Sequence, residues 1–124
     1  MKIVIGLGVQ KSGTTSLYSS FVGLENIFYK PVKKECHFME NPNANVSNYV
    51  ETCFNNKSNT KYNFEITPLY LNSIHAVYNI MKLSEVIPSI FVILRNPVYR
   101  SISSAGGKGY TANKYKNHIN TFEP

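Results

Sequence analysis

The sequence has no tryptophan, only two cysteines among its 124 residues, and few acidic side chains, with 7 Asp and Glu against 13 Lys and Arg. Two cysteines cannot make the disulfide framework of a small secreted domain, so we expect a reduced compartment such as the cytoplasm. The shortage of acidic residues leaves a formal charge of +6. This charge favours anionic partners such as a nucleotide, an acidic glycan, a nucleic acid or a membrane surface, but does not choose among them.

Long apolar runs are also missing. No run is long enough to span a bilayer, and the start of the chain lacks the charged and apolar regions of a signal peptide. We therefore expect no membrane segment in this chain, and a Golgi-lumen location only if it were excised from a membrane-anchored parent. A chain of this length can form one domain at most.

Short apolar runs followed by turns are the main pattern that is present. We expect strands at residues 3–7, 26–29, 62–66 and 89–94, and helices at 14–24, 46–54, 71–83 and 97–104. Strands that alternate with helices predict an α/β fold, with a P-loop-like parallel sheet of about four strands and helices on both faces. Residues 1–104 would form this core, and residues 105–124 a basic, poorly defined tail. On the helix at 71–83, the spacing of Ile74, Val77, Tyr78 and Met81 predicts a buried face.

The segment GLGVQKSGTTSL, residues 6–17, has the properties of a phosphate-binding loop. An apolar strand enters it and a helix leaves it, so glycines allow close approach while the helix N-terminus adds partial positive charge. The hydroxyls of Thr14, Thr15 and Ser16 stand at the helix start as further donors.

This loop differs from that of an ATPase or a small-molecule kinase. The ATPase motif places Lys directly after its second glycine, whereas here Thr14 follows Gly13 and the lysine is Lys11. The apolar run at 90–94 ends in Arg95 where a metal-binding Asp would be needed. Both positions disfavour metal-dependent nucleotide hydrolysis.

Several reactive side chains follow predicted strands. Ligands of open α/β sheets bind at the carboxyl ends of the strands. We therefore expect one rim of the sheet to carry Lys11, Glu35, His37, Glu65 and Arg95.

Four stretches together resemble one family. They are GVQKSGTTSL (8–17), ECHF (35–38), FEITPLYL (64–71) and LRNPVYRSIS (94–103). The chain resembles, over about residues 3–104, the sulfotransferases that use 3′-phosphoadenosine-5′-phosphosulfate (PAPS), especially the glycan-modifying branch related to heparan sulfate sulfotransferases. The first and last stretches look like that family's 5′-phosphosulfate loop and 3′-phosphate segment. The middle two are similar to its acceptor-side segment and to a strand end.

The resemblance implies PAPS as the cofactor, no metal, and transfer of a sulfuryl group to a hydroxyl or amine of an acceptor. The favoured acceptor class is a glycan, and no nucleic-acid partner is expected. The implied cofactor-binding residues are Lys11, Ser12, Gly13, Thr14, Thr15, Ser16, Arg95 and Ser103.

The implied catalytic residues are Lys11, Glu35 and His37. Lys11 would meet the bridging oxygen as charge develops on it. Glu35 is the preferred general base and His37 the rival, because imidazole accepts a proton near neutral pH. Lys33 and Lys34 would weaken Glu35 as a base unless they point elsewhere, for instance to an acidic acceptor. The adjacent Cys36 and His37 lack the ligand spacing of a structural zinc site.

Three departures from the family pattern remain, and two other functions stay open. Asn96 replaces an Asp, Ile66 replaces a Lys used by some heparan-type members, and family members continue beyond Pro124 with a closing segment. The first alternative is a non-catalytic nucleotide-binding or glycan-binding module. The second, which the loop disfavours, is a small-molecule kinase.

Overall fold

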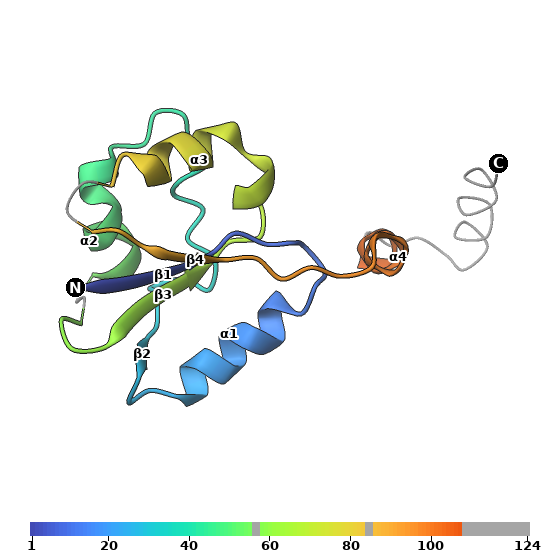
Figure 1. Cartoon of the computed structure of the whole chain (residues 1–124), viewed down its shortest axis with the longest axis horizontal. Helices are drawn as coiled ribbons and strands as arrows, with labels where there is room; N and C mark the ends of the chain where they lie inside the picture. Colours follow the sequence, from blue (N-terminus) through green and yellow to red (C-terminus); the bar gives the residue numbers. More distant parts are fainter. Residues whose placement is uncertain (56–57, 84–85, 108–124) are drawn as a thin grey trace.

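The computed structural model describes residues 1–55, 58–83 and 86–107 (Figure 1). The strands are β1 (Lys2–Gly6), β2 (Phe28–Tyr29), β3 (Tyr62–Ile66) and β4 (Ser89–Phe91). The helices are α1 (Thr14–Gly23), α2 (Tyr49–Phe54), α3 (Ile74–Met81) and α4 (Pro97–Gly107), and 3₁₀ turns at Val46–Asn48 and Tyr70–Asn72 precede α2 and α3. Every expected helix and strand is present; β3 has the predicted ends, and the ends of the other elements are shifted.

The four strands form one all-parallel sheet in the order β2-β3-β1-β4, which confirms the predicted α/β class. The central strand β1 pairs with β3 on one side and β4 on the other, so that Ile5 lies opposite both Glu65 and Ile90. Ile3 and Ile5 are almost fully buried. This burial explains why β1 is continuously apolar, as strands of covered parallel sheets are.

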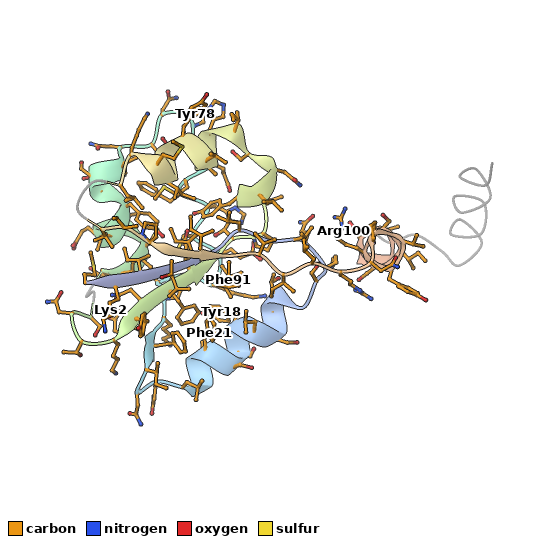
Figure 2. The ribbon with its side chains drawn as sticks, viewed as in Figure 1. Lys2, Tyr18, Phe21, Tyr78, Phe91 and Arg100 are labelled. Atoms are coloured by element: carbon orange, nitrogen blue, oxygen red, sulfur yellow. The ribbon has the colours of Figure 1, made fainter. Side chains whose placement is uncertain are left out.

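Helices cover both faces of the sheet, α1 on one and α2 with α3 on the other (Figure 1). Beneath α1 the packing is aromatic: the Phe21 ring stacks on Phe28 at 4.2 Å and meets Phe64 edge-on at 5.1 Å. Figure 2 shows Tyr18, Phe21 and Phe91 gathered there. The opposite core contains Ile3, Ile5, Met39, Tyr49, Cys53, Phe54, Tyr70, Ala76 and Ile80.

The predicted buried face of α3 is wrong. Ile74, Val77, Tyr78 and Met81 are exposed, and Tyr78 points away from the sheet in Figure 2. The buried residues are instead Ala76, Asn79 and Ile80. Asn79 can be buried because its side-chain amide donates to the backbone carbonyls of Met39 at 2.7 Å and Asn41 at 3.0 Å.

The last helix, α4, stands apart from the sheet at the end of an extended segment (Figure 1). Asn96 begins it, since its side-chain oxygen accepts from the Val98 N–H at 2.9 Å and Pro97 occupies the first helical position. The helix runs to Gly107, three residues into the predicted tail, and residues 108–124 lie outside the described part. Within the described ranges, no helix is both long and apolar enough to cross a membrane.

Candidate functional site

The loop that follows β1 lies between the segments that follow β3 and β4. On one side, the Thr67 N–H donates to Gly6 at 3.1 Å and the Leu71 N–H to Leu7 at 2.9 Å. On the other side, the backbones of Val9 and Ile93 are linked by a hydrogen bond of 2.9 Å. Backbone contacts of three of the four stretches singled out in the sequence, or of the residues directly before them, therefore bring these stretches to one edge of the sheet.

The backbone of this loop needs glycine at two places. Gly8 has a φ of 140°, and a Cβ there would lie 2.7 Å from the Pro68 carbonyl oxygen. Gly13 has a φ of 88° and forms the N-cap of α1 without a side-chain cap. Because the first turn of α1 also has no acidic residue, its free N–H groups and dipole leave a positive end.

The side chains of the loop differ in exposure. Thr14 is buried, whereas Lys11, Thr15 and Ser16 are exposed. The hydroxyl oxygen of Ser12 is buried and has no hydrogen-bond partner within the described residues. The Ser12 hydroxyl group is therefore available as a hydrogen-bond donor beside the positive N-terminal end of α1.

Arg95, which follows β4, reaches this loop. Its guanidinium Nη1 donates to the Lys11 carbonyl oxygen at 2.8 Å. Lys11 itself has a left-handed φ of 61°, which Arg95 helps to hold. Ser103 lies on α4, and within the described part of the chain it shares no hydrogen bond with Arg95.

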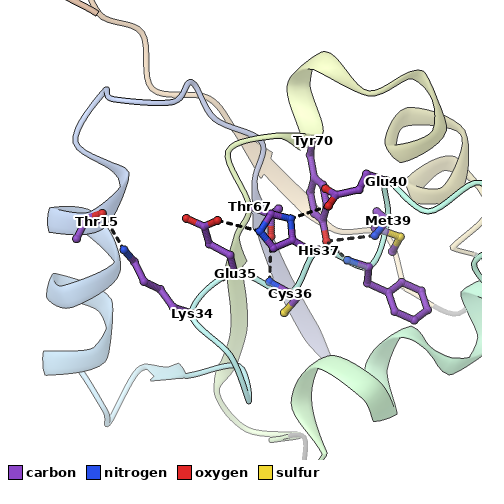
Figure 3. Close-up of polar contacts among 10 residues, drawn as sticks. Thr15, Lys34, Glu35, Cys36, His37, Met39, Glu40, Thr67 and Tyr70 are labelled. Atoms are coloured by element: carbon purple, nitrogen blue, oxygen red, sulfur yellow. Dashed lines mark hydrogen bonds and ion pairs between the residues drawn. The ribbon is translucent and has the colours of Figure 1, made fainter. Parts of the chain in front are cut away.

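The stretch at 35–38, which the resemblance assigns to the acceptor side, rests on the segment after β3 (Figure 3). The Cys36 N–H donates to the Thr67 hydroxyl at 3.1 Å. The hydroxyl oxygen of Tyr70 accepts from the N–H groups of Phe38 at 3.1 Å and Met39 at 3.2 Å. Thr67 and Tyr70 therefore fix the loop that carries Glu35 and His37.

His37 lies between two carboxylates. Its Nε2 is 3.0 Å from Glu35 Oε2 and its Nδ1 is 2.6 Å from Glu40 Oε1 (Figure 3). Partial burial lowers the pKa of His37, but the hydrogen bonds and charges of Glu40 and Glu35 outweigh it, and the net shift is upward. The sequence argument missed Glu40, although its position three residues after His37 is a signal that could have identified it.

Lys34 was also missed as part of this site. Its ammonium Nζ donates to the hydroxyl of Thr15, in the first turn of α1, at 2.8 Å. Lys33 has a different position, because it lines a pocket of about 80 Å³ with Val32, Cys36, Thr52 and Cys53.

Glu65 is not on the rim where the sequence argument put it. Its side chain is fully buried, and among the described residues neither carboxylate oxygen has a hydrogen-bond partner of good geometry. Burial raises the pKa of Glu65, and the nearby groups of Cys36, Tyr70, Tyr49 and Cys53 only reduce that rise. Glu65 therefore lies in the core, where burial favours its neutral form, and within the described residues it makes no hydrogen bond to Lys11 or Arg95.

Three side chains of this core, those of Cys36, Cys53 and Glu65, are of types that can bind a metal ion. Their ligand atoms lie within 4.8 Å of one another. The Cys53 thiol and burial raise the pKa of Cys36, so the thiol stays protonated. Among the described residues no fourth His, Cys, Asp or Glu joins them. The cluster fits a neutral, packed interior.

The fold and this edge define an α/β protein with an all-parallel sheet and four loop segments gathered at the carboxyl ends of its strands. Comparison with family models, curated proteins and solved structures finds no match to this chain. The functional argument therefore depends on the motifs and on the geometry of the site.

Proposed function

We propose that this chain is a PAPS-dependent sulfotransferase, or the cofactor-binding core of one, which transfers a sulfuryl group to a hydroxyl or amine of an acceptor, with a glycan as the favoured class. The observation that carries the proposal is the hydrogen bond from Arg95 to the Lys11 carbonyl. It joins the two segments that the resemblance assigns to the two phosphate-bearing ends of one cofactor, although they lie far apart in the sequence.

The loop and the start of α1 would hold the 5′-phosphosulfate. The uncapped N-terminus of α1 favours an anion, and the hydroxyls of Ser12, Thr14, Thr15 and Ser16 are suitable donors. Lys11 would stand beside the oxygen that bridges phosphorus and sulfur. As the sulfur–oxygen bond to the leaving phosphate breaks, negative charge grows on that oxygen, and the ammonium group stabilises it.

Arg95 would bind the 3′-phosphate. A guanidinium has five N–H donors, and the bond to Lys11 uses one of them. The remaining donors match the oxygens of a phosphate in a fixed plane. Ser103 is the second proposed ligand on this side, and it would need α4 to approach the loop.

Glu35 would be the general base. Both ring nitrogens of His37 already contact carboxylates, so His37 is less able than Glu35 to accept the acceptor's proton. In the transfer, the acceptor oxygen or nitrogen bonds to sulfur while its proton passes to Glu35. His37 and Glu40 would hold the Glu35 carboxylate in place.

A calorimetric titration with adenosine 3′,5′-bisphosphate, with and without Mg²⁺, tests the proposal. We expect saturable binding that does not need Mg²⁺, since cationic side chains and N–H groups supply the positive charge. Adenosine is the control ligand and should bind far more weakly. Binding that requires Mg²⁺ would favour a kinase, and no binding at all would contradict the proposal.

A non-catalytic binding module is the remaining candidate, and it is favoured by the position of α4. This helix, which carries Ser103, stands away from the sheet (Figure 1). Binding without turnover on any acceptor would support this second function.

A further inference from the structure

We infer that Lys34 is a second cation of the donor site, which binds the 5′-phosphate end of the nucleotide from the acceptor-side loop. This inference rests on the proposed function, because it needs an anion at the start of α1. It adds a residue for which the sequence suggested an acidic acceptor as one possible partner.

The position of the Lys34 ammonium group is the first observation. Its Nζ lies 2.8 Å from Thr15 Oγ1, in the first turn of α1 (Figure 3). In that view the Lys34 side chain extends towards α1, whereas Glu35 turns towards His37. Consecutive residues of one loop thus reach the proposed donor side and the proposed acceptor side.

Electrostatics supports an anion beside this ammonium group. The N-terminal end of a helix repels cations, since its dipole and free N–H groups are positive. Here no acidic residue in the first turn of α1 and no side-chain cap on Gly13 offsets that charge. Within the described part of the chain Lys34 forms no salt bridge, and Glu35 pairs with His37 instead. An anion between Lys34 and the start of α1 would resolve this repulsion.

A functional consequence follows from the shared loop. A nucleotide held by Lys34 would restrain the backbone of the neighbouring Glu35. Binding of the donor would therefore help to position the base, so that donor binding and acceptor chemistry are coupled.

The chain offers a matched control one residue away. Lys33 has the same charge, the same exposure class and the same loop, but it lines the pocket beside Cys53 and Thr52. A general attraction of the nucleotide to positive charge would affect both lysines equally. A specific contact would affect Lys34 alone.

The experiment titrates wild type, Lys34→Ala and Lys33→Ala with two nucleotides, adenosine 3′,5′-bisphosphate and adenosine 3′-monophosphate. We expect Lys34→Ala to weaken binding of the bisphosphate about tenfold, the scale of one charged hydrogen bond, and to change the monophosphate less than twofold. Lys33→Ala should leave both affinities within about twofold of wild type. Lys34→Arg should retain most of the bisphosphate affinity, because it keeps the charge.

The outcomes separate the two proposals. If wild type binds the bisphosphate and Lys34→Ala loses no more affinity than Lys33→Ala, the role of Lys34 is wrong and the proposed function stands. Equal losses for the two nucleotides would also overturn the role, since the monophosphate has no 5′-phosphate. If wild type binds neither nucleotide, the proposed function fails and the inference fails with it. Thermal unfolding of each variant verifies that it is folded.

Discussion

Lys11 combines an exposed ammonium group with a left-handed backbone, and Arg95 holds its carbonyl oxygen. A lysine in this position can serve binding, chemistry or both. The distinction depends on when its anionic partner appears. Removing an interaction made mainly in the transition state lowers the rate without lowering ground-state affinity by the same factor.

Lys11→Ala should abolish sulfuryl transfer and weaken binding of adenosine 3′,5′-bisphosphate only modestly, because under the proposed function the main partner of Lys11 is the charge that develops on the leaving oxygen. Measured turnover with labelled PAPS and calorimetric affinity would be compared for the same preparation. Lys82→Ala, in the turn after α3, is the control and should leave both unchanged. Full turnover by Lys11→Ala would remove its assigned role.

Arg95→Ala should weaken binding of ligands with a 3′-phosphate by about 1.5 to 3 kcal/mol, the scale of a charged hydrogen bond. Binding of ligands that have only a 5′-phosphate should weaken little, because the hydrogen bond from Arg95 to the Lys11 carbonyl is exposed and contributes little to the stability of the loop. Adenosine 3′,5′-bisphosphate and adenosine 5′-monophosphate make the comparison by calorimetry. Arg95→Lys should give an intermediate loss, since it keeps the charge but not the planar fork. Equal losses for both ligands would show that Arg95 does not recognise that phosphate.

His37 should make the stability of the protein depend on pH. Because its pKa is raised in the folded state, the ion pairs with Glu35 and Glu40 contribute fully below the unfolded pKa of about 6.5. That contribution is lost as the pH rises through the raised folded value. The difference in melting temperature between wild type and His37→Gln should thus be larger at pH 6 than at pH 8.

His75→Gln is the control for this pH series. His75 is exposed on α3 and makes no ion pair among the described residues. The difference in melting temperature between His75→Gln and wild type should be the same at pH 6 and at pH 8. A pH-independent difference for His37→Gln would mean that its two carboxylate contacts add no stability.

At the scale of elements, the segment after β3 supports the acceptor-side loop through Tyr70. Tyr70→Phe should destabilise the protein by about 1 to 3 kcal/mol, since it leaves the N–H groups of Phe38 and Met39 without an acceptor. Chemical denaturation measures the loss, and Tyr78→Phe, on the exposed side of α3, should cost almost nothing. If the two variants unfold alike, the Tyr70 hydroxyl does not support this loop.

The sequence predicted the elements better than their faces. The strand at 62–66 has the predicted ends, because its alternation of apolar and polar residues, bounded by turns, depends on local pattern alone. The face of α3 could not be predicted, because its burial depends on the carbonyls of Met39 and Asn41, which accept from Asn79. The spacing of apolar residues along a helix gives no sign that a polar side chain such as the amide of Asn79 is buried.

Contacts between segments were the other part beyond sequence reasoning. The pattern placed Lys11, Glu35 and Arg95 after strands, and the parallel topology brings such positions to one edge. The same rule failed for Glu65, which faces the core under α2, because alternation along β3 and not strand position decides its direction. Lys34 contacts α1 through the length of its side chain, which no spacing rule supplies, whereas the spacing of Glu40 from His37 was a usable signal.

At the scale of the whole molecule, the isolated chain should bind the nucleotide but transfer sulfuryl groups slowly or not at all. The proposed phosphate contacts and the base all lie within residues 1–104. Transfer also needs the sulfuryl group shielded from water, and α4 stands apart from the loop (Figure 1). Incubation with a radiolabelled sulfate donor and a panel of glycans measures turnover. Rapid, saturable labelling of one acceptor would contradict this expectation.

The strand order also governs how this chain can fold. Lys2 pairs with Tyr62 and Val4 with Ser89, so the central strand has no partner from its own neighbourhood in the sequence. No adjacent pair of strands is a hairpin, and each pairing must close a long loop before it gains hydrogen bonds. During synthesis, β1 and its apolar side chains therefore remain unpaired until β3 has left the ribosome, and the sheet is complete only after β4 has followed. Of these four strands, β1, which leads into the proposed phosphate loop, is thus synthesised first but gains its pairing partners last.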